Sequence, residues 1–384
     1  MTQIFVPAAF YRGGSSKGVF FHLRHCPEDR AALDRMLLSA LGSPDPYGRQ
    51  LDGMGGGTSS LSKAVIIGPP THPEADVDYT FAQIAVDRAV VDWGANCGNL
   101  SSAVGPFAVD EGLVRVADDE ALVRIHQVNT RKIIHARFPA RGGKAVTAGD
   151  FTVDGVSGSG APIALDFLEP GGTVTAGLLP TGRAIEMIEI DGHDYEMSLV
   201  DATNPVAFVA AADLGIEGWE LPDAIEANRD LMALLDQLRR AAGMRMGLGP
   251  NPESIGLANP KIAVVSTPAR FLTLDGRSVG AQEHDVAVRM LSMERAHRAV
   301  TLTGAMCLAV ACRIEGSLPH RLCIADAGAE AIRVAHPSGL VVAGAAVHQA
   351  DGRWHVDSAR VYRTARRLMQ GEVAVAPFDG EREG

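Results

Sequence analysis

The segment Asp92-Trp93-Gly94-Ala95-Asn96-Cys97-Gly98-Asn99-Leu100-Ser101-Ser102-Ala103 joins an apolar, strand-like run at residues 81–91 to a run of small residues at 101–109. The second run is typical of a helix, so Cys97 is expected at a strand-to-helix turn, with Gly98 and Asn99 opening the helix. Unpaired N–H groups and the positive end of the helix dipole attract anions at such a position. The alternative is a small buried cysteine without a function.

The length, composition and net charge limit which classes of protein this chain can belong to. The chain has 384 residues, which suggests one long domain or two ordinary ones, and its 46% hydrophobic content is typical of a globular protein. The formal net charge of -11 argues against nucleic acid or an anionic membrane as the main partner. No apolar run is long enough to span a bilayer, and the first residues do not resemble a signal peptide.

The five cysteines are odd in number and do not have metal-ligand spacing. They therefore predict neither a disulfide framework nor a metal site, and a reducing cytoplasm fits them best. The sequence leaves the oligomeric state open, and a homodimer is compatible with it.

The segment Arg12-Gly13-Gly14-Ser15-Ser16-Lys17-Gly18 lies between two apolar runs that are typical of strands. Its glycines allow positive φ and close backbone approach, and its other side chains supply hydrogen-bond donors. This pattern indicates either an anion-binding turn or a plain polar hairpin.

A second glycine-rich segment, Asp52-Gly53-Met54-Gly55-Gly56-Gly57-Thr58-Ser59-Ser60-Leu61-Ser62-Lys63, precedes an apolar strand-like run. A Walker loop or a dinucleotide loop would instead follow a strand and open a helix. The segment therefore predicts a set of N–H groups and hydroxyls suited to carboxylate oxygens, with one lysine at its end. A flexible loop with a surface lysine is the alternative.

The second half of the chain repeats the order of these features. A strand, a polar turn and a strand surround Asn204, and a helix opens near Pro222. Lys261 precedes an apolar run as Lys63 does, and Leu302-Thr303-Gly304-Ala305 opens a second small-residue helix. The strands are short and frequent, which favours curled sheets around few helices over a doubly wound fold. The repeat predicts two similar domains with a helix N-terminus from each at a shared cleft, although common strand and helix patterns can coincide by chance.

Taken together, the motifs around Arg12, Asp52 and Asn96-Cys97-Gly98-Asn99, with His336-Pro337-Ser338-Gly339 near the end, resemble the PrpF family over nearly the whole chain. The resemblance implies an α+β fold like that of diaminopimelate epimerase: two pseudo-symmetric domains, each a curled, mostly antiparallel sheet around a central helix. We expect these domains at residues 1–183 and 184–371, with residues 372–384 as a strand that returns to the first.

The resemblance also implies a site. Lys63 and Cys97 are the expected catalytic residues, and the sequence does not order their roles. The residues expected to bind substrate are Arg12, Ser15, Ser16, Lys17, Gly56, Gly57, Thr58, Ser59, Ser60, Gly98, Asn99, Asn204, Thr303 and Gly304. On this match the second cysteine of the epimerase would fall near Thr301, which is not a cysteine, so the pattern argues against a two-thiol racemase of amino acids.

The implied activity is a cofactor-independent isomerisation of an unsaturated tricarboxylic acid such as 2-methylaconitate, by a shift of a proton and double bond or a change of cis-trans geometry. A base would remove a proton next to a conjugated double bond, and the resulting dienolate would need stabilisation by positive groups. Neither a metal nor an organic cofactor is expected. The alternatives are a keto-enol tautomerase of the 4-oxalomesaconate type and a non-catalytic protein that binds an aconitate-like ligand.

Overall fold

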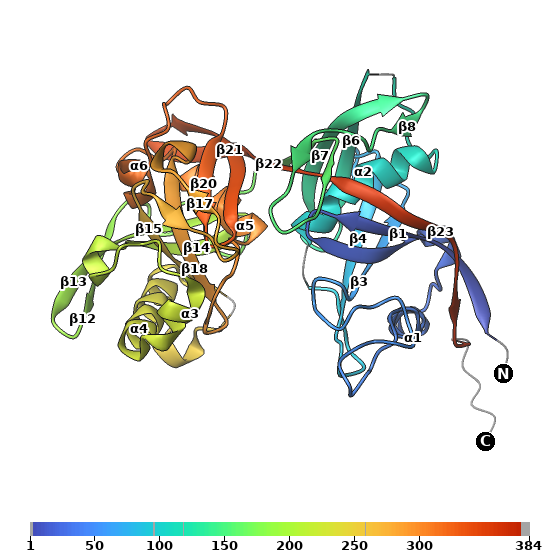
Figure 1. Ribbon diagram of the computed structural model, residues 1–384, viewed down its shortest axis with the longest axis horizontal. Helices are drawn as coiled ribbons and strands as arrows, with labels where there is room; N and C mark the ends of the chain where they lie inside the picture. The colour runs from blue at the N-terminus through green and yellow to red at the C-terminus, as the bar shows by residue number, and fades with distance from the viewer. Residues whose placement is uncertain (1–2, 95–96, 118, 258, 378–384) are drawn as a thin grey trace. The chain divides into compact units, whose positions relative to one another are not determined.

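The computed structural model describes residues 3–94, 97–117, 119–257 and 259–377, so Asn96 of the cysteine motif lies outside the described residues. The chain divides into two compact units (Figure 1). Unit 1 contains the residues up to Leu165 and those from Tyr362 onwards, and unit 2 is Asp166–Val361.

These divisions differ from the expected boundaries at 183/184 and 371/372, for identifiable reasons. The loop that follows residue 169 belongs to unit 2, because the Asp201 carboxylate accepts hydrogen bonds from the backbone N–H groups of Val174 and Thr175. The last strand, β23 (Ala365–Val375), belongs wholly to unit 1, because it pairs with β1 (Ile4–Gly13) from Gly13↔Ala365 to Ile4↔Val375.

Unit 1 is a curled sheet around the helix α2. Its remaining elements are β2 (Ser16–His22), η1 (Leu23–His25), α1 (Arg30–Leu41), β3 (Lys63–Gly68), β4 (Val77–Ile84), β5 (Val91–Asp92), α2 (Gly98–Asp110), β6 (Asp119–Gln127), β7 (Lys132–Arg141), β8 (Lys144–Ala145), β9 (Phe151–Thr152), β10 (Ser159–Gly160) and the first half of β11 (Ile163–Leu168). Along the sheet β1 is antiparallel to β2, β2 parallel to β3, β3 antiparallel to β4, β4 parallel to β6, and β6 antiparallel to β7. Helix α2 contacts β1, β2, β6, β7, β8 and β23, and so lies on the inner face (Figure 1).

Helix α1 covers the outer face of this sheet. Asp29 caps its first turn by accepting a hydrogen bond from the N–H of Ala32, and Gly42 ends it with φ of 73°. Its apolar face, with Met36 and Leu37, packs against alternate residues of β2 and β3 such as Val19 and Ala64. Because successive side chains of a strand point to opposite faces, this contact fixes which residues of β2 and β3 face α2.

Unit 2 repeats this arrangement. Its elements are β12 (Glu186–Ile190), β13 (His193–Ala202), β14 (Asn204–Ala210), η2 (Ala212–Leu214), α3 (Pro222–Ala227), α4 (Arg229–Arg245), η3 (Pro252–Ser254), β15 (Lys261–Ser266), β16 (Phe271–Leu272), β17 (Ser278–Val279), η4 (Ala281–Glu283), β18 (Val286–Ser292), β19 (Arg295–Ala296), α5 (Leu302–Ala311), α6 (Leu318–Leu322), β20 (Ile332–His336), β21 (Gly339–Ala350) and most of β22 (Arg353–Arg363). The order β13, β14, β15, β18, β20, β21 has the same sequence of antiparallel and parallel pairings as β1, β2, β3, β4, β6, β7. Helix α5 contacts β13, β14 and β21 as α2 contacts the sheet of unit 1.

The expected fold class is therefore confirmed, with two local corrections. The strand-like run at residues 81–91 is interrupted, since β4 ends at Ile84 and only Val91 and Asp92 resume pairing. The helix expected from Pro222 is two helices, because Asn228 leaves the helical conformation and its side chain caps α4 through the N–H of Leu231. No described helix has both the length and the apolar character needed to cross a membrane.

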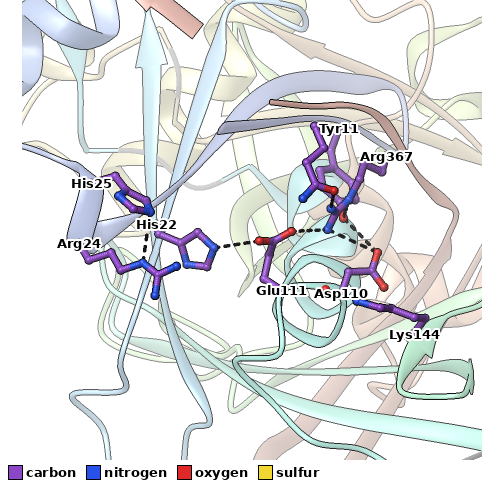
Figure 2. Close-up of polar contacts among 9 residues, drawn as sticks. Tyr11, His22, Arg24, His25, Asp110, Glu111, Lys144 and Arg367 are labelled. Atoms are coloured by element: carbon purple, nitrogen blue, oxygen red, sulfur yellow. Dashed lines mark hydrogen bonds and ion pairs between the residues drawn. The ribbon is translucent and has the colours of Figure 1, made fainter. Parts of the chain in front are cut away.

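The C-terminal end of α2 is held by a polar cluster around Arg367 of β23 (Figure 2). Arg367 Nε donates a hydrogen bond to Tyr11 Oη at 2.7 Å, and its Nη2 lies 2.8 Å from Glu111 Oε1 as an ion pair without hydrogen-bond geometry. Tyr11 Oη also donates to Asp110 at 3.3 Å, and Glu111 Oε2 is 3.2 Å from His22 Nε2. The cluster joins β1, β2 and β23 to the end of the helix that begins after Cys97.

Burial opposes ionisation of Glu111, but the hydrogen bond with His22 and the charge of Arg367 hold the pKa of this carboxyl below its ordinary value. A lowered folded-state pKa stabilises the fold above the ordinary carboxyl pKa, and this stabilisation is lost as pH falls through the folded value. We therefore expect Glu111→Gln to lower the free energy of unfolding by about 1–3 kcal/mol at pH 7. In urea titrations the difference from wild type should shrink below about pH 4, while the exposed Glu120→Gln should show little effect at any pH. If the difference in free energy of unfolding between Glu111→Gln and wild type instead grew as the pH fell below about 4, this assignment would be wrong.

Candidate functional site

Cys97 is the N-cap of α2 and is 8% exposed. Its thiol donates to Ser16 Oγ across 3.8 Å, so it lies against the first residue of β2. Its carbonyl oxygen accepts hydrogen bonds from Tyr79 Oη at 3.4 Å and from Ser101 Oγ at 3.1 Å. The thiol is thus fixed at the start of the central helix, as the sequence predicted.

Asn99, in the first turn of α2, connects this helix start to the β1–β2 turn. Its Nδ2 donates to Ser15 Oγ at 3.3 Å. Gly14 has φ of 50°, which favours glycine, and a Cβ on Gly13 would lie 2.7 Å from the backbone oxygen of Asn99, so the glycines allow the turn to approach the helix closely. Ser15, Ser16, Gly98 and Asn99 are therefore brought together with Cys97.

Arg363, which sequence reasoning missed, completes this group. It is 9% exposed, and its Nε donates to Asn99 Oδ1 at 3.1 Å while Nη1 donates to Tyr362 O at 2.8 Å. Within the described ranges no carboxylate is bonded to it. Burial lowers the pKa of Arg363 to about 10. A buried guanidinium whose partners are only neutral groups is well suited to an incoming carboxylate.

Lys63 begins β3 and is 8% exposed. Its neighbours Ala64 and Ile66 pack on the α1 side of the sheet, so Lys63 points to the α2 side. Its Nζ donates to Gln83 Oε1 at 2.6 Å and lies 5.0 Å from the centroid of the Phe81 ring. This ammonium group is therefore held by a neutral amide and an aromatic ring.

Lys63 and Cys97 share the inner face through adjacent residues. On β4, Phe81 contacts the Lys63 ammonium, and Tyr79, two residues earlier and on the same face, is bonded to the Cys97 carbonyl. A Cβ on Gly18 would lie 2.8 Å from Lys63 O and 3.0 Å from Leu100 Cδ1 of α2. The lysine and the thiol are thus carried by neighbouring positions around the start of α2.

The glycine-rich loop lies beside Lys63. Gln50, which is 1% exposed, accepts a hydrogen bond from the N–H of Gly57 at 3.0 Å and donates to Ser62 Oγ at 2.7 Å. Gln83, the partner of Lys63, donates to Ser59 O at 3.0 Å. Of the expected loop residues, Ser59 and Ser60 accept hydrogen bonds from β4 and β2 through their carbonyl groups. Gly56, Gly57 and Thr58 precede them in the loop.

The structure does not bring Arg12 and Lys17 into this group. Lys17 has the same strand parity as Val19, which packs on the α1 side, and its Nζ lies 5.8 Å from the centroid of the Phe10 ring. Arg12 pairs with Lys17 in the hairpin, and its Nη1 donates to the carbonyl and hydroxyl oxygens of Thr364 at 2.5 and 2.7 Å. Both cations are therefore on the opposite face from Lys63.

In unit 2, the expected residues Asn204, Thr303 and Gly304 lie around the start of α5. Thr301 is the N-cap of this helix, and its hydroxyl accepts a hydrogen bond from the N–H of Gly304. Thr203 Oγ1 donates to Thr303 O at 2.7 Å, which fixes the turn before Asn204. Cys307 is inside α5, bonded to Val200 O, and burial raises the pKa of its thiol. Thr301, not a thiol, occupies the position in unit 2 that Cys97 has in unit 1.

Comparison with known proteins identifies relatives along the whole chain. The family described as PrpF protein matches residues 3–376. The 3-methylitaconate isomerase of Eubacterium barkeri is 38% identical over 97% of this chain and 98% of its own length. The 2-methyl-aconitate isomerase of Cupriavidus necator is 39% identical, with coverage of 97% and 98%. The crystal structure of methylitaconate-delta-isomerase is similar with a TM-score of 0.92 at 35% identity, covering 100% of this chain and 99% of that one. The chain therefore belongs to the PrpF family and is an isomerase.

Proposed function

We propose that this protein isomerises an unsaturated tricarboxylic acid such as 2-methylaconitate, without a cofactor, by moving a proton and a double bond or by changing cis-trans geometry. The names of the two full-length relatives, which are isomerases of methylitaconate and methylaconitate, support this class of substrate. The observation that carries the proposal is the placement of an amine, Lys63, and a thiol, Cys97, around one helix start that also holds Arg363.

The chemistry requires one proton to leave a carbon and one to return. In the proposed reaction a C–H bond next to the conjugated double bond breaks, and its electron pair spreads into a dienolate. Reprotonation at a different carbon moves the double bond, whereas rotation within the dienolate followed by reprotonation changes the geometry. Substrate and product have the same composition, so only acid–base groups and charge stabilisation are needed.

The proposed roles follow from the surroundings of each group. Lys63 and Cys97 transfer the protons, and either order is compatible with their placement. The guanidinium of Arg363 and the first N–H groups of α2, at Gly98 and Asn99, bind a carboxylate and stabilise the charge that develops on it. The hydroxyls of Ser15 and Ser16 and the loop around Ser59 bind the other polar groups of the acid.

We further propose that the reaction takes place in the cytoplasm. All five cysteines of the chain are free thiols. Free thiols throughout a protein are typical of a reducing compartment.

Proton exchange in heavy water tests the proposed function directly. Incubation of the protein with 2-methylaconitate, methylitaconate or 4-oxalomesaconate in D2O should replace carbon-bound hydrogens of one acid by deuterium, as observed by NMR, at a rate proportional to enzyme concentration. Exchange into 4-oxalomesaconate alone would indicate the keto-enol tautomerase instead. Tight binding of an acid without any exchange would contradict catalysis and favour a binding protein.

A further inference from the structure

Lys63 and Gln83 lie opposite each other on two neighbouring strands of unit 1. They are directly paired in the antiparallel register of β3 and β4, so their side chains share one face of the sheet. Gln83 Oε1 accepts a hydrogen bond from Lys63 Nζ at 2.6 Å. Phe81, two residues before Gln83, is on the same face, and the centroid of its ring is 5.0 Å from Lys63 Nζ. The amine is therefore held by an amide and an aromatic ring of the same strand.

The other end of the Gln83 amide is bonded to the glycine-rich loop. Its Nε2 donates to Ser62 O at 2.8 Å and to Ser59 O at 3.0 Å, which uses both of its hydrogens. A rotated amide would place these hydrogens against the ammonium hydrogens of Lys63, and its oxygen against two carbonyl oxygens. The hydrogen-bond pattern thus assigns the orientation of the amide, which presents only an acceptor to Lys63.

Ser62 gives this amide a firm support. Its carbonyl oxygen also accepts a hydrogen bond from the N–H of Ile84 at 3.1 Å, and its hydroxyl donates to Ile84 O at 2.9 Å. The same hydroxyl accepts a hydrogen bond from Gln50 Nε2 at 2.7 Å, and Ser62 and Gln50 are 0% and 1% exposed. Because the residue before Lys63 is fixed to β4 in this way, Gln83 has little freedom to turn its oxygen away from the amine.

A neutral acceptor suits an amine that has to gain and lose a proton. Among the described residues Lys63 forms no ion pair with a carboxylate. A carboxylate in the place of the amide would favour the ammonium form and oppose release of the proton. The amide oxygen binds one N–H of Lys63 in either protonation state, so the lone pair of the neutral amine cannot point toward Gln83. This contact therefore fixes the direction in which Lys63 takes or gives a proton.

We propose that Gln83 is a positioning residue for Lys63: its amide oxygen aims the amine, and its two bonds to the loop keep the amide from turning. The inference rests on the proposed function, in which Lys63 transfers a proton, and adds to it a residue that acts through Lys63. It predicts an effect on the proton affinity of Lys63 that can be measured without any substrate.

The first test follows this proton affinity by NMR in the full chain, produced with isotope-labelled lysine. Titration of the ε-carbon signals gives a midpoint pH for each lysine, and the Lys63 signal is identified by its loss in Lys63→Arg. Gln83→Leu removes the acceptor and should lower the Lys63 midpoint by about one pH unit, whereas Gln83→Glu supplies a charged acceptor and should raise it by about one unit or more. The other four lysines should keep their midpoints: Lys17, Lys132, Lys144 and Lys261.

Steady-state kinetics with the acid identified by proton exchange gives the second readout. Gln83→Leu should lower kcat by about tenfold to a hundredfold, the range for losing a hydrogen bond to a charged group, with little change in KM. In Gln83→Glu the limb of the kcat profile that depends on Lys63 should move to higher pH, because the carboxylate favours the ammonium form. The sign is the same whether Lys63 acts as the base or as the acid.

A matched control comes from unit 2. Gln349→Leu removes an exposed amide from β21 and should change neither the Lys63 midpoint nor kcat. Urea titrations measure the free energy of unfolding of each variant. A loosened fold would move the midpoints of several lysines together, whereas loss of positioning moves that of Lys63 alone.

An unchanged Lys63 midpoint in both Gln83→Leu and Gln83→Glu would overturn the proposal. A raised KM with normal kcat would do so too, because Gln83 would then bind substrate instead. A fall in kcat with similar midpoint shifts in all five lysines would show that Gln83 only maintains the fold. Failure of the proposed function is a different result, in which the wild type exchanges no protons with any acid. The opposite midpoint shifts in the two variants would then decide by themselves whether Gln83 positions Lys63.

Discussion

Lys63→Ala is expected to lower kcat by roughly 10²–10⁴-fold, the usual loss when a general acid–base group is removed. The reason is that Lys63 is held on the inner face by Gln83 Oε1 and the Phe81 ring, next to the helix start that carries Cys97. Turnover of the acid identified by proton exchange, measured at saturating substrate, checks this prediction.

The matched variants separate proton transfer from binding. Lys63→Arg keeps a positive charge that does not give up its proton, so it should retain substrate binding but lose turnover. Lys132→Ala removes a half-buried lysine of the β6–β7 hairpin and should leave kcat unchanged. Near-normal turnover in both Lys63→Ala and Cys97→Ala would show that neither residue carries the chemistry.

Arg363→Gln is expected to lower kcat/KM by about 10²–10³-fold, the loss typical of removing one group that stabilises an oxyanion. Arg363 is buried, is bonded only to Asn99 Oδ1 and Tyr362 O among the described residues, and lies at the N-terminal end of α2, where unpaired N–H groups favour an anion. Both the affinity for the carboxylate and the stability of the dienolate should therefore fall. Calorimetric titration with tricarballylate, a saturated tricarboxylate that cannot be isomerised, measures the loss of affinity. Steady-state kinetics measures the total loss of kcat/KM.

The control for this prediction lies on the same segment of chain. Arg366→Gln removes an exposed guanidinium three residues further on and should have little effect on kcat/KM. Arg363→Lys should recover only part of the lost activity, because an ammonium group does not reproduce the fork of the guanidinium. If Arg363→Gln folds normally and its kcat/KM is close to wild type, Arg363 only supports the helix start.

The sequence by itself determined the order of the elements and the position of Cys97. Small residues after Gly98 favour a helix, and the repeated strand, helix and glycine segments predict two similar units. These features are local, because a helix start or a turn depends on a few neighbouring residues. They also place Lys63 at the end of the glycine-rich loop, directly before a strand-like run, and in the structure Lys63 is the first residue of β3.

Only the tertiary structure decided which cations accompany that lysine. Lys17 follows Ser15 and Ser16, which contact Asn99 and Cys97, but the β1–β2 register turns Lys17 to the α1 face. Arg363 is 264 residues from Asn99 in the sequence, and no local pattern distinguishes it from the exposed Arg366. Likewise the loop after residue 169 belongs to unit 2 because its backbone N–H groups donate hydrogen bonds to Asp201, and the amino-acid composition does not predict these bonds. The physical reason is that strand parity and long-range pairing determine the face and the neighbours of a side chain, and both are fixed only when distant segments come together.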